Sequence, residues 1–114
     1  MGTISGDQLR GHLEGLILAS LEDGPSHGWD IWRNLESAGG GALALKEGSL
    51  YPALYRLERE GLIAARWETK ATGRAGPRRR VYRLSAKGRR RLHAARDQWR
   101  QFVAVVGNLL GAPA

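Results

Sequence analysis

The strongest constraint on the fold lies in the middle of the chain, where a helical pattern ends at a glycine and passes directly into a strand pattern. The helical part covers residues 47–60, and Gly61 separates it from an extended segment that begins at Leu62. Alternating apolar positions predict one strand over 62–67 and a second over 81–84, joined by a loop rich in arginine and glycine. The centre of the chain is therefore expected to fold as a helix beside a basic hairpin.

The helical segment has two chemically different faces. At about 100° per residue, one face is aliphatic and is expected to enter the core; it carries Leu50, Ala53, Leu54 and Leu57. The opposite face is too aromatic for an idle surface and too basic for a core; it carries Tyr51, Pro52, Tyr55, Arg56 and Arg59. Ser49 is the predicted N-cap, which places Pro52 in the first turn, where no intrahelical N–H is lost. The open N–H groups of that turn would offer a site for a phosphate.

A helix with such a face beside a basic hairpin predicts a mainly α-helical winged helix-turn-helix that binds double-stranded DNA. The helix can enter a major groove, and the hairpin can hold the phosphates alongside it. Four cations of the loop and of the strand that follows it are the predicted phosphate contacts, namely Lys70, Arg74, Arg78 and Arg79. They are expected to position the DNA backbone without reading bases. His27, at the start of the preceding helix, is expected within reach of a phosphate or of its own turn.

The charge distribution favours a polyanionic partner. The net charge of +7 conceals an asymmetry, because residues 1–65 carry five Lys and Arg against nine Asp and Glu, whereas residues 66–114 carry thirteen against two. The basic block adjoins the candidate recognition helix, and this position favours nucleic acid as the partner. A solvated basic face is the plainer alternative.

Two further helices are predicted before this region. Apolar residues at three- and four-residue spacing predict a first amphipathic helix over residues 7–22. Ser26 is the predicted N-cap of a second helix that ends at 39–41, with Trp32, Leu35 and either Trp29 or Ile31 facing inward. Residues 39–44 match the pattern G-x-G-x-x-A, but a helix precedes them, so we interpret them as a turn and not as a dinucleotide site.

The chain is expected to close with a long amphipathic helix that begins after Ser85. Its apolar residues repeat every seven positions, at 92, 99 and 106 and at 95, 102 and 109. This seam needs a partner, either the first helix of the same chain, the same helix of a second chain, or both, and we expect a homodimer. The predicted dimer seam consists of Leu92, Ala95, Trp99, Phe102, Val103 and Val106. The large rings could leave a slot for a planar aromatic effector, although plain interface packing is the simpler explanation.

Several other classes of protein are disfavoured. At 114 residues the chain is one modest domain, and the lack of cysteine excludes a disulfide framework and favours a cytoplasmic location. No segment approaches the length of a membrane-spanning helix or the pattern of a signal peptide. The three histidines lie on separate predicted elements at no metal-ligand spacing, so no metal or cofactor is expected. No nucleophile elbow or phosphate loop is present, and we expect no catalytic activity.

Five blocks of the chain resemble the PadR family of bacterial transcriptional regulators. They are residues 9–21, 24–31, 47–58, 61–63 and 80–88, and the most specific part is Leu50-Tyr51-Pro52. The resemblance implies a winged helix-turn-helix domain over residues 1–84 and a C-terminal dimerisation helix over 85–114, with only one helix after the wing. It also implies a repressor that a small molecule releases from DNA. Two positions depart from the common pattern, because Trp29 and Val81 stand where the family usually has tyrosine.

Two functions from different classes remain open. The favoured one is a sequence-specific regulator of promoter DNA. The other is an architectural or protein-interaction module whose basic wing contacts nucleic acid without sequence choice, or acidic proteins. The exposed face with Tyr51, Tyr55, Arg56 and Arg59 discriminates between them, because such side chains can read base edges whereas a nonspecific binder needs only charge.

Overall fold

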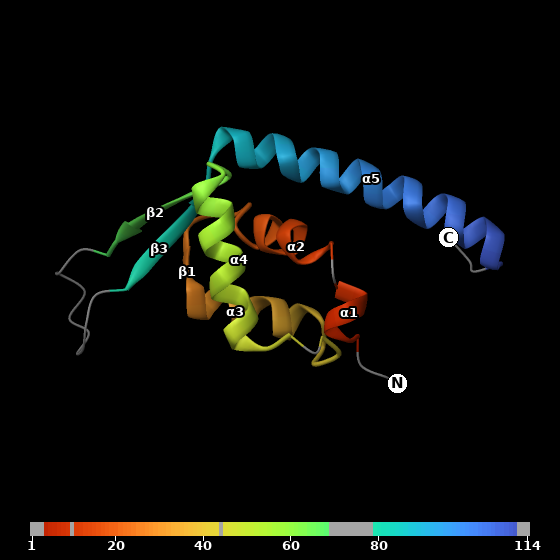
Figure 1. The fold of residues 1–114 in the computed structure, drawn as a ribbon, viewed down its shortest axis with the longest axis horizontal. Helices are drawn as coiled ribbons and strands as arrows, with labels where there is room; N and C mark the ends of the chain where they lie inside the picture. The colour runs from red at the N-terminus through yellow and green to blue at the C-terminus, as the bar shows by residue number, and fades with distance from the viewer. Residues whose placement is uncertain (1–3, 10, 44, 69–78, 112–114) are drawn as a thin grey trace.

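The computed structural model describes residues 4–9, 11–43, 45–68 and 79–111 (Figure 1). The helices and strands of these residues follow in the order α1 (Gly6–Leu9), α2 (Leu13–Ser20), β1 (Ser26–His27), α3 (Gly28–Ala38), α4 (Glu47–Arg59), β2 (Ile63–Trp67), β3 (Arg80–Leu84) and α5 (Ala86–Leu110). Helices α2, α3 and α4 form the body, the β2–β3 hairpin extends from one side of it, and α5 crosses the body and projects from the other side. The predicted fold class, mainly α with a small β-hairpin, is confirmed.

A three-stranded antiparallel sheet holds the hairpin to the helices, with the strand order β1-β3-β2. Its register pairs Ile63 with Leu84 and Trp67 with Arg80 on one side of β3, and His27 with Val81 on the other. The two predicted strands of the hairpin are confirmed, whereas β1 was not predicted. A strand of two residues has no periodicity that a sequence pattern could show, and only its pairing with β3 defines it.

The core lies where α2, α3 and α4 meet the sheet. The predicted aliphatic face of α4 is confirmed, since its leucines and Ala53 are almost completely buried. Around it pack Ile17, Leu18, Leu21, Ile31, Leu35, Leu62, Ile63, Tyr82, Leu84 and Leu92. Burial raises the pKa of the Tyr82 hydroxyl, because the low-dielectric surroundings disfavour the charged form. Of the two alternatives for α3, Ile31 enters the core while Trp29 stays on the surface and stacks on Trp32.

The first predicted helix is divided in two, which corrects the continuous helix expected over residues 7–22. Gly11 has a φ of 86°, in the left-handed region that an α-helix cannot contain. Helix α1 has its own N-terminal capping box, because Gln8 N–H donates to Ser5 Oγ while the Gln8 side chain accepts from Ser5 N–H. Helix α2 then starts at Leu13.

Two predicted N-caps are also wrong. Ser26 belongs to β1, and its pairing with Tyr82 keeps the backbone extended, so α3 begins one residue later than a Ser26 cap would allow. Helix α4 begins at Glu47, with the extended residue Lys46 before it, and Ser49 N–H bonds to the Lys46 carbonyl. Pro52 therefore lies in the second turn of α4, where it does remove one intrahelical hydrogen bond. The Pro52 ring is exposed, so the missing hydrogen bond lies on the outer side of the helix.

The start of α5 is anchored on the turn between α4 and β2. Ser85 is its N-cap as predicted, because the hydroxyl oxygen accepts from Gly88 N–H at 2.9 Å. The same hydroxyl lies 2.9 Å from the Leu62 carbonyl oxygen, and Lys87 Nζ donates to the carbonyl oxygen of Glu60. The direction of α5 is thereby set by the end of α4. Among the described residues, no helix combines the length and the apolar character that crossing a bilayer requires.

A pair of hydrogen bonds between Glu22 and Arg96 joins α5 to the end of α2, with both N–O distances at 2.8 Å. These bonds hold the pKa of the Glu22 carboxyl below its usual range. A carboxyl whose pKa is lower in the folded state contributes stability above its unfolded pKa and loses it as the pH falls through the folded value. We therefore expect Glu22→Gln to destabilise the protein at pH 7, with a difference from the unchanged protein that shrinks below about pH 4. Urea unfolding at both pH values tests this.

The matched control for this prediction is Asp97→Asn, which also removes one carboxylate that is paired with an arginine. Asp97 and Arg100 are mostly exposed neighbours on α5, at an N–O distance of 3.2 Å. An exposed pair of this kind contributes little. Equal effects of the two substitutions at pH 7 would contradict the structural role of the Glu22 pair.

Candidate nucleic-acid interface

The outer face of α4, made of Tyr51, Pro52, Tyr55, Arg56 and Arg59, is exposed as the wheel predicts. Tyr55 is 64% exposed and Tyr51 is 44% exposed. The Arg59 guanidinium lies over the Tyr55 ring, 5.7 Å from its centroid. Ser49 is also exposed, closer to the N-terminus of the helix. This face presents aromatic and guanidinium groups together, the side-chain types that can hydrogen-bond and stack on nucleic acid.

Tyr51 is positioned by the start of α3. A Cβ atom built on Gly28 would lie 3.0 Å from Tyr51 Cε1 and 3.4 Å from its hydroxyl, so the ring packs directly on the glycine backbone. The glycine of the His27-Gly28 pair is therefore a site of close approach between α3 and α4. One edge of Tyr51 is held by this contact, and 44% of the residue remains exposed.

Arg80 connects the hairpin to α4 on one face of the sheet. Its Nη2 donates to Glu58 Oε2 at 2.7 Å, and its guanidinium lies 5.5 Å from the centroid of the Trp67 ring. A shallow hollow between the hairpin and α4 is lined by Tyr55, Glu58, Arg59 and Arg80. The charges of Glu58 and Arg80 compensate each other there, so Arg80 acts as a link within the protein as well as a cation of the surface.

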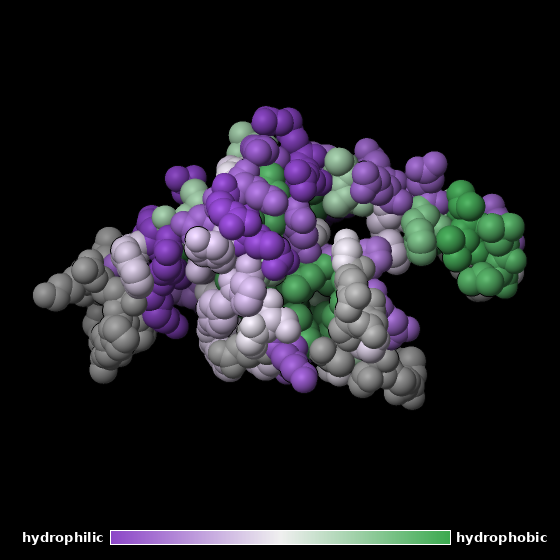
Figure 2. All heavy atoms as spheres, in the orientation of Figure 1, coloured by the Kyte–Doolittle hydropathy of each residue, from purple (hydrophilic) through white to green (hydrophobic). Residues whose placement is uncertain are grey.

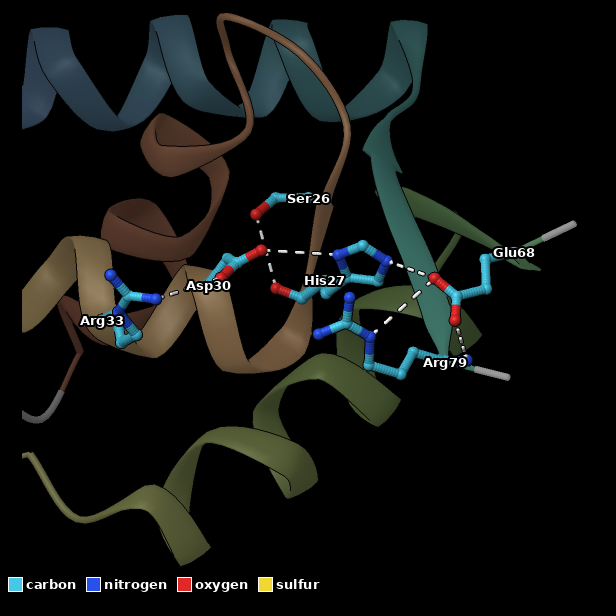
Figure 3. Close-up of polar contacts among 6 residues, drawn as sticks. All are labelled: Ser26, His27, Asp30, Arg33, Glu68 and Arg79. Carbon is cyan, nitrogen blue, oxygen red and sulfur yellow. Dashed lines mark hydrogen bonds and ion pairs between the residues drawn. The ribbon is translucent and has the colours of Figure 1, made fainter. Parts of the chain in front are cut away.

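Glu68, His27 and Arg79 connect the hairpin to α3 on the other face of the sheet (Figure 3). His27 Nε2 lies 2.9 Å from Glu68 Oε2, and Arg79 N–H donates to Glu68 Oε1 at 3.1 Å. The second ring nitrogen of His27 faces Asp30 Oδ2 at 3.4 Å, and Arg33 continues the chain of contacts at 3.8 Å from Asp30. Both ring nitrogens of His27 are thus turned to carboxylates, and this phosphate candidate is part of an internal link.

The predicted wing residues divide into two groups. Lys70, Arg74 and Arg78 lie outside the described residues. Arg79 is 41% exposed and its Nε lies 3.8 Å from Glu68, so it is shared between the surface and the internal link. Two further arginines that the sequence pattern did not indicate, Arg66 and Arg83, are exposed on the hairpin strands.

Glu68, Glu58, Arg80 and Trp67 are the site residues that sequence reasoning missed. Only Glu68 carried a usable signal, since it is one of two acidic residues in the basic block 66–114. An isolated acid within a cationic segment suggests an internal partner. Nothing in the sequence near the other three indicated that they would meet.

The residues of the predicted dimer seam on α5 fall into two groups, one packed against the same chain and one more exposed farther along the helix. Leu92 is buried in the core of the same chain. Ala95 packs against Gly15 of α2, since a Cβ atom built on Gly15 would lie 3.6 Å from Ala95 Cβ. Farther along, Trp99 and Phe102 are 51% and 53% exposed and stack on each other at 5.7 Å, with the His12 ring edge-on to Trp99. Val103 and Val106 belong to this outer part. Figure 2 shows apolar residues gathered at its end, where Leu109 and Leu110 lie exposed.

The arrangement of α3, α4 and the β2–β3 hairpin defines a winged helix-turn-helix domain, a class of fold found in DNA-binding regulators. The family model described as "Transcriptional regulator PadR-like family" matches residues 17–94. The chain therefore belongs to the PadR-like family of transcriptional regulators, as the sequence blocks implied.

Solved structures agree with this assignment. A transcriptional regulator from Clostridium thermocellum is 28% identical and superimposes with a TM-score of 0.82, covering 93% of this chain and 97% of that one. A PadR-like regulator from Bacillus cereus is 30% identical with a TM-score of 0.77, covering 92% and 97%. Bacillus subtilis PadR, solved in complex with operator DNA, is 29% identical with a TM-score of 0.64, covering 75% of this chain and 46% of that one.

Proposed function

We propose that this protein is a homodimeric, sequence-specific repressor that binds promoter DNA through the outer face of α4 and the β2–β3 hairpin. The observation that carries the proposal is that outer face, which exposes two tyrosines and two arginines on a helix whose other side is core. The solved complex of Bacillus subtilis PadR with operator DNA supports it. Helix α4 would enter the major groove with Tyr51 and Arg56 at base edges, while Ser49 and the helix start approach a phosphate.

Selection of bound duplexes from a random pool, followed by footprinting, tests sequence-specific binding. A two-fold dimer presents two equivalent recognition helices, so we expect an inverted repeat with half-sites centred about 34–36 Å apart. Selected duplexes without any shared sequence would instead favour the nonspecific architectural or protein-interaction module.

Arginine substitutions identify the face that reads the bases. We expect Arg56→Ala to weaken binding to the selected site by about 1–3 kcal/mol and to relax sequence choice at the contacted positions. The same reasoning applies to Tyr51→Ala. Arg90→Ala is the matched control, since it removes an equal charge from an exposed position on α5. If both arginine variants lose affinity equally on all duplexes, α4 contributes charge and not base recognition.

The cations of the wing have a different proposed role. Lys70, Arg74, Arg78 and Arg79 would contact phosphates, so an alanine at any one position should weaken specific and nonspecific duplexes alike. The slope of log affinity against log salt should flatten by about 0.9 for each phosphate that the variant no longer binds. A changed sequence preference at constant slope would show instead that the wing reads bases.

Release by a planar aromatic effector is the remaining part of the proposal. The exposed stack of Trp99 and Phe102 on α5 supports it, because two such stacks brought together by a dimer axis would offer aromatic walls to a flat ligand. Titration with planar aromatic dyes should quench tryptophan fluorescence and lower DNA affinity together. Trp99→Phe should remove the quenching. Quenching that survives in this variant, or binding without loss of DNA affinity, would leave the seam as plain packing.

A further inference from the structure

Glu68 is the one charged residue that is buried among the described residues, with 6% of its surface exposed. It follows the end of β2, in a segment where almost every other ionisable residue is basic. A buried carboxylate is unfavourable unless hydrogen bonds replace its lost water. Here the carboxylate accepts from Arg79 N–H and contacts His27 Nε2, and its own N–H donates to the Arg79 carbonyl at 2.8 Å. An ionised carboxylate only accepts hydrogen bonds, so this contact suits a His27 ring that donates from Nε2.

The Glu68–His27 contact joins the two outer edges of the sheet. The strand order is β1-β3-β2, so Glu68 and His27 lie on opposite sides of β3, and the two side chains meet across it (Figure 3). His27 is also the residue that leads into α3. The loop end of the hairpin strands is therefore tied to the first turn of α3, the helix that supports Tyr51.

A second link holds the opposite face of the hairpin. Successive residues of a strand point to opposite faces, and Arg79 and Arg80 show this, since Arg79 contacts Glu68 while Arg80 pairs with Glu58 of α4. One face of the hairpin is thus attached to α3 and the other to α4. Two attachments on opposite faces define the angle between the hairpin and α4.

We propose that Glu68 is a positioning residue for DNA binding, which sets the angle of the hairpin so that its exposed Arg66 and Arg83 meet phosphates while α4 lies in the groove. This inference rests on the proposed function. Glu68 itself touches no DNA in this arrangement, because its carboxylate is turned inward. Its effect is exerted through His27 and the backbone of Arg79.

The sign of the effect separates positioning from simple electrostatics. Removing a negative charge close to a DNA-binding surface should, by charge alone, raise affinity for the polyanion. Loss of positioning should lower it. Glu68→Gln removes the charge and keeps a side-chain oxygen for Arg79 N–H. Glu60→Gln is the matched control, with the same change at an exposed position at the end of α4.

The experiment measures binding of the full chain to its selected duplex across a range of salt concentrations. We expect Glu68→Gln to bind roughly tenfold more weakly, as when a charge-assisted hydrogen bond no longer orders a bound geometry. Its salt slope should be smaller by about 0.9 for each phosphate that the hairpin no longer binds. Glu60→Gln should bind equally or more tightly with an unchanged slope. Unchanged or tighter binding by Glu68→Gln at the original slope would overturn the proposal, and so would equal losses in both variants.

A second pair of variants keeps the test valid if Glu68→Gln does not fold. His27→Gln retains a side-chain N–H that can donate to Glu68, whereas His27→Leu has none. The glutamine variant should bind the duplex with unchanged affinity and an unchanged salt slope. The leucine variant should bind more weakly and with a smaller salt slope. Equal behaviour of the two would overturn the positioning role. Failure of the unchanged protein to bind any duplex would instead overturn the proposed function, and this inference with it.

Discussion

Replacing Gly88 by alanine is expected to destabilise the protein by about 3 kcal/mol, the upper end of what overpacking a dense interior costs. A Cβ atom at this position would collide with the carbonyl oxygen of Leu62 and lie 2.9 Å from Leu84 Cδ1. The carbonyl belongs to the backbone and is already held by the N–H and hydroxyl of Ser85. It cannot rotate away as a side chain could, so α5 would have to move off the α4–β2 turn.

Gly48→Ala is the control for this prediction. Gly48 also lies within a helix, but a Cβ atom there would meet nothing within 4 Å. Alanine is the better helix former by roughly 1 kcal/mol, so this variant should be neutral or slightly more stable. Denaturant unfolding followed by circular dichroism measures both. Similar stability of the two variants would show that α5 does not depend on close contact with Leu62.

In the proposed homodimer, a charge on the outer part of the α5 seam is expected to separate the two subunits and to weaken binding to an inverted repeat by about 10²–10⁴-fold. Phe102→Asp is the change, because a carboxylate buried between two helices would lack a partner. The large effect arises because the second half-site no longer binds as part of the same molecule. Phe102 is half-exposed in the single chain, so the fold should survive the substitution.

Gln101→Asp is the matched control, since it introduces the same charge at the neighbouring, exposed position on the side of α5 that carries Asp97 and Asn108. It should remain dimeric and bind the repeat with nearly unchanged affinity. Sedimentation and DNA binding measured on the same samples decide the matter. A dimer that persists in Phe102→Asp would place the interface elsewhere, and the half-site geometry would then have to follow from another surface.

Much of the candidate interface could be predicted because its signals are local. The two faces of α4 follow from spacing within a single helix, and the burial of Leu50 and Leu54 against the exposure of Tyr55 confirms them. The roles of His27 and Arg79 could not be predicted in the same way. The sequence predicted a phosphate contact for Arg79, and either a phosphate or its own turn as the partner of His27, yet in the folded chain each contacts the carboxylate of Glu68. Charge alone cannot distinguish a surface cation from one that has an internal partner.

By itself the sequence determined the features that depend on patterns among neighbouring residues. These are the amphipathic α4, the β2–β3 hairpin, the Ser85 cap and the apolar stripe of α5. Only the tertiary structure decided which distant residues meet. The Glu68–His27 pair spans 41 positions and the Glu22–Arg96 pair spans 74, and β1 exists only through its pairing with β3. Periodicity and capping act over a few residues of backbone, whereas these contacts depend on how whole elements pack, and packing leaves no pattern in the neighbouring sequence.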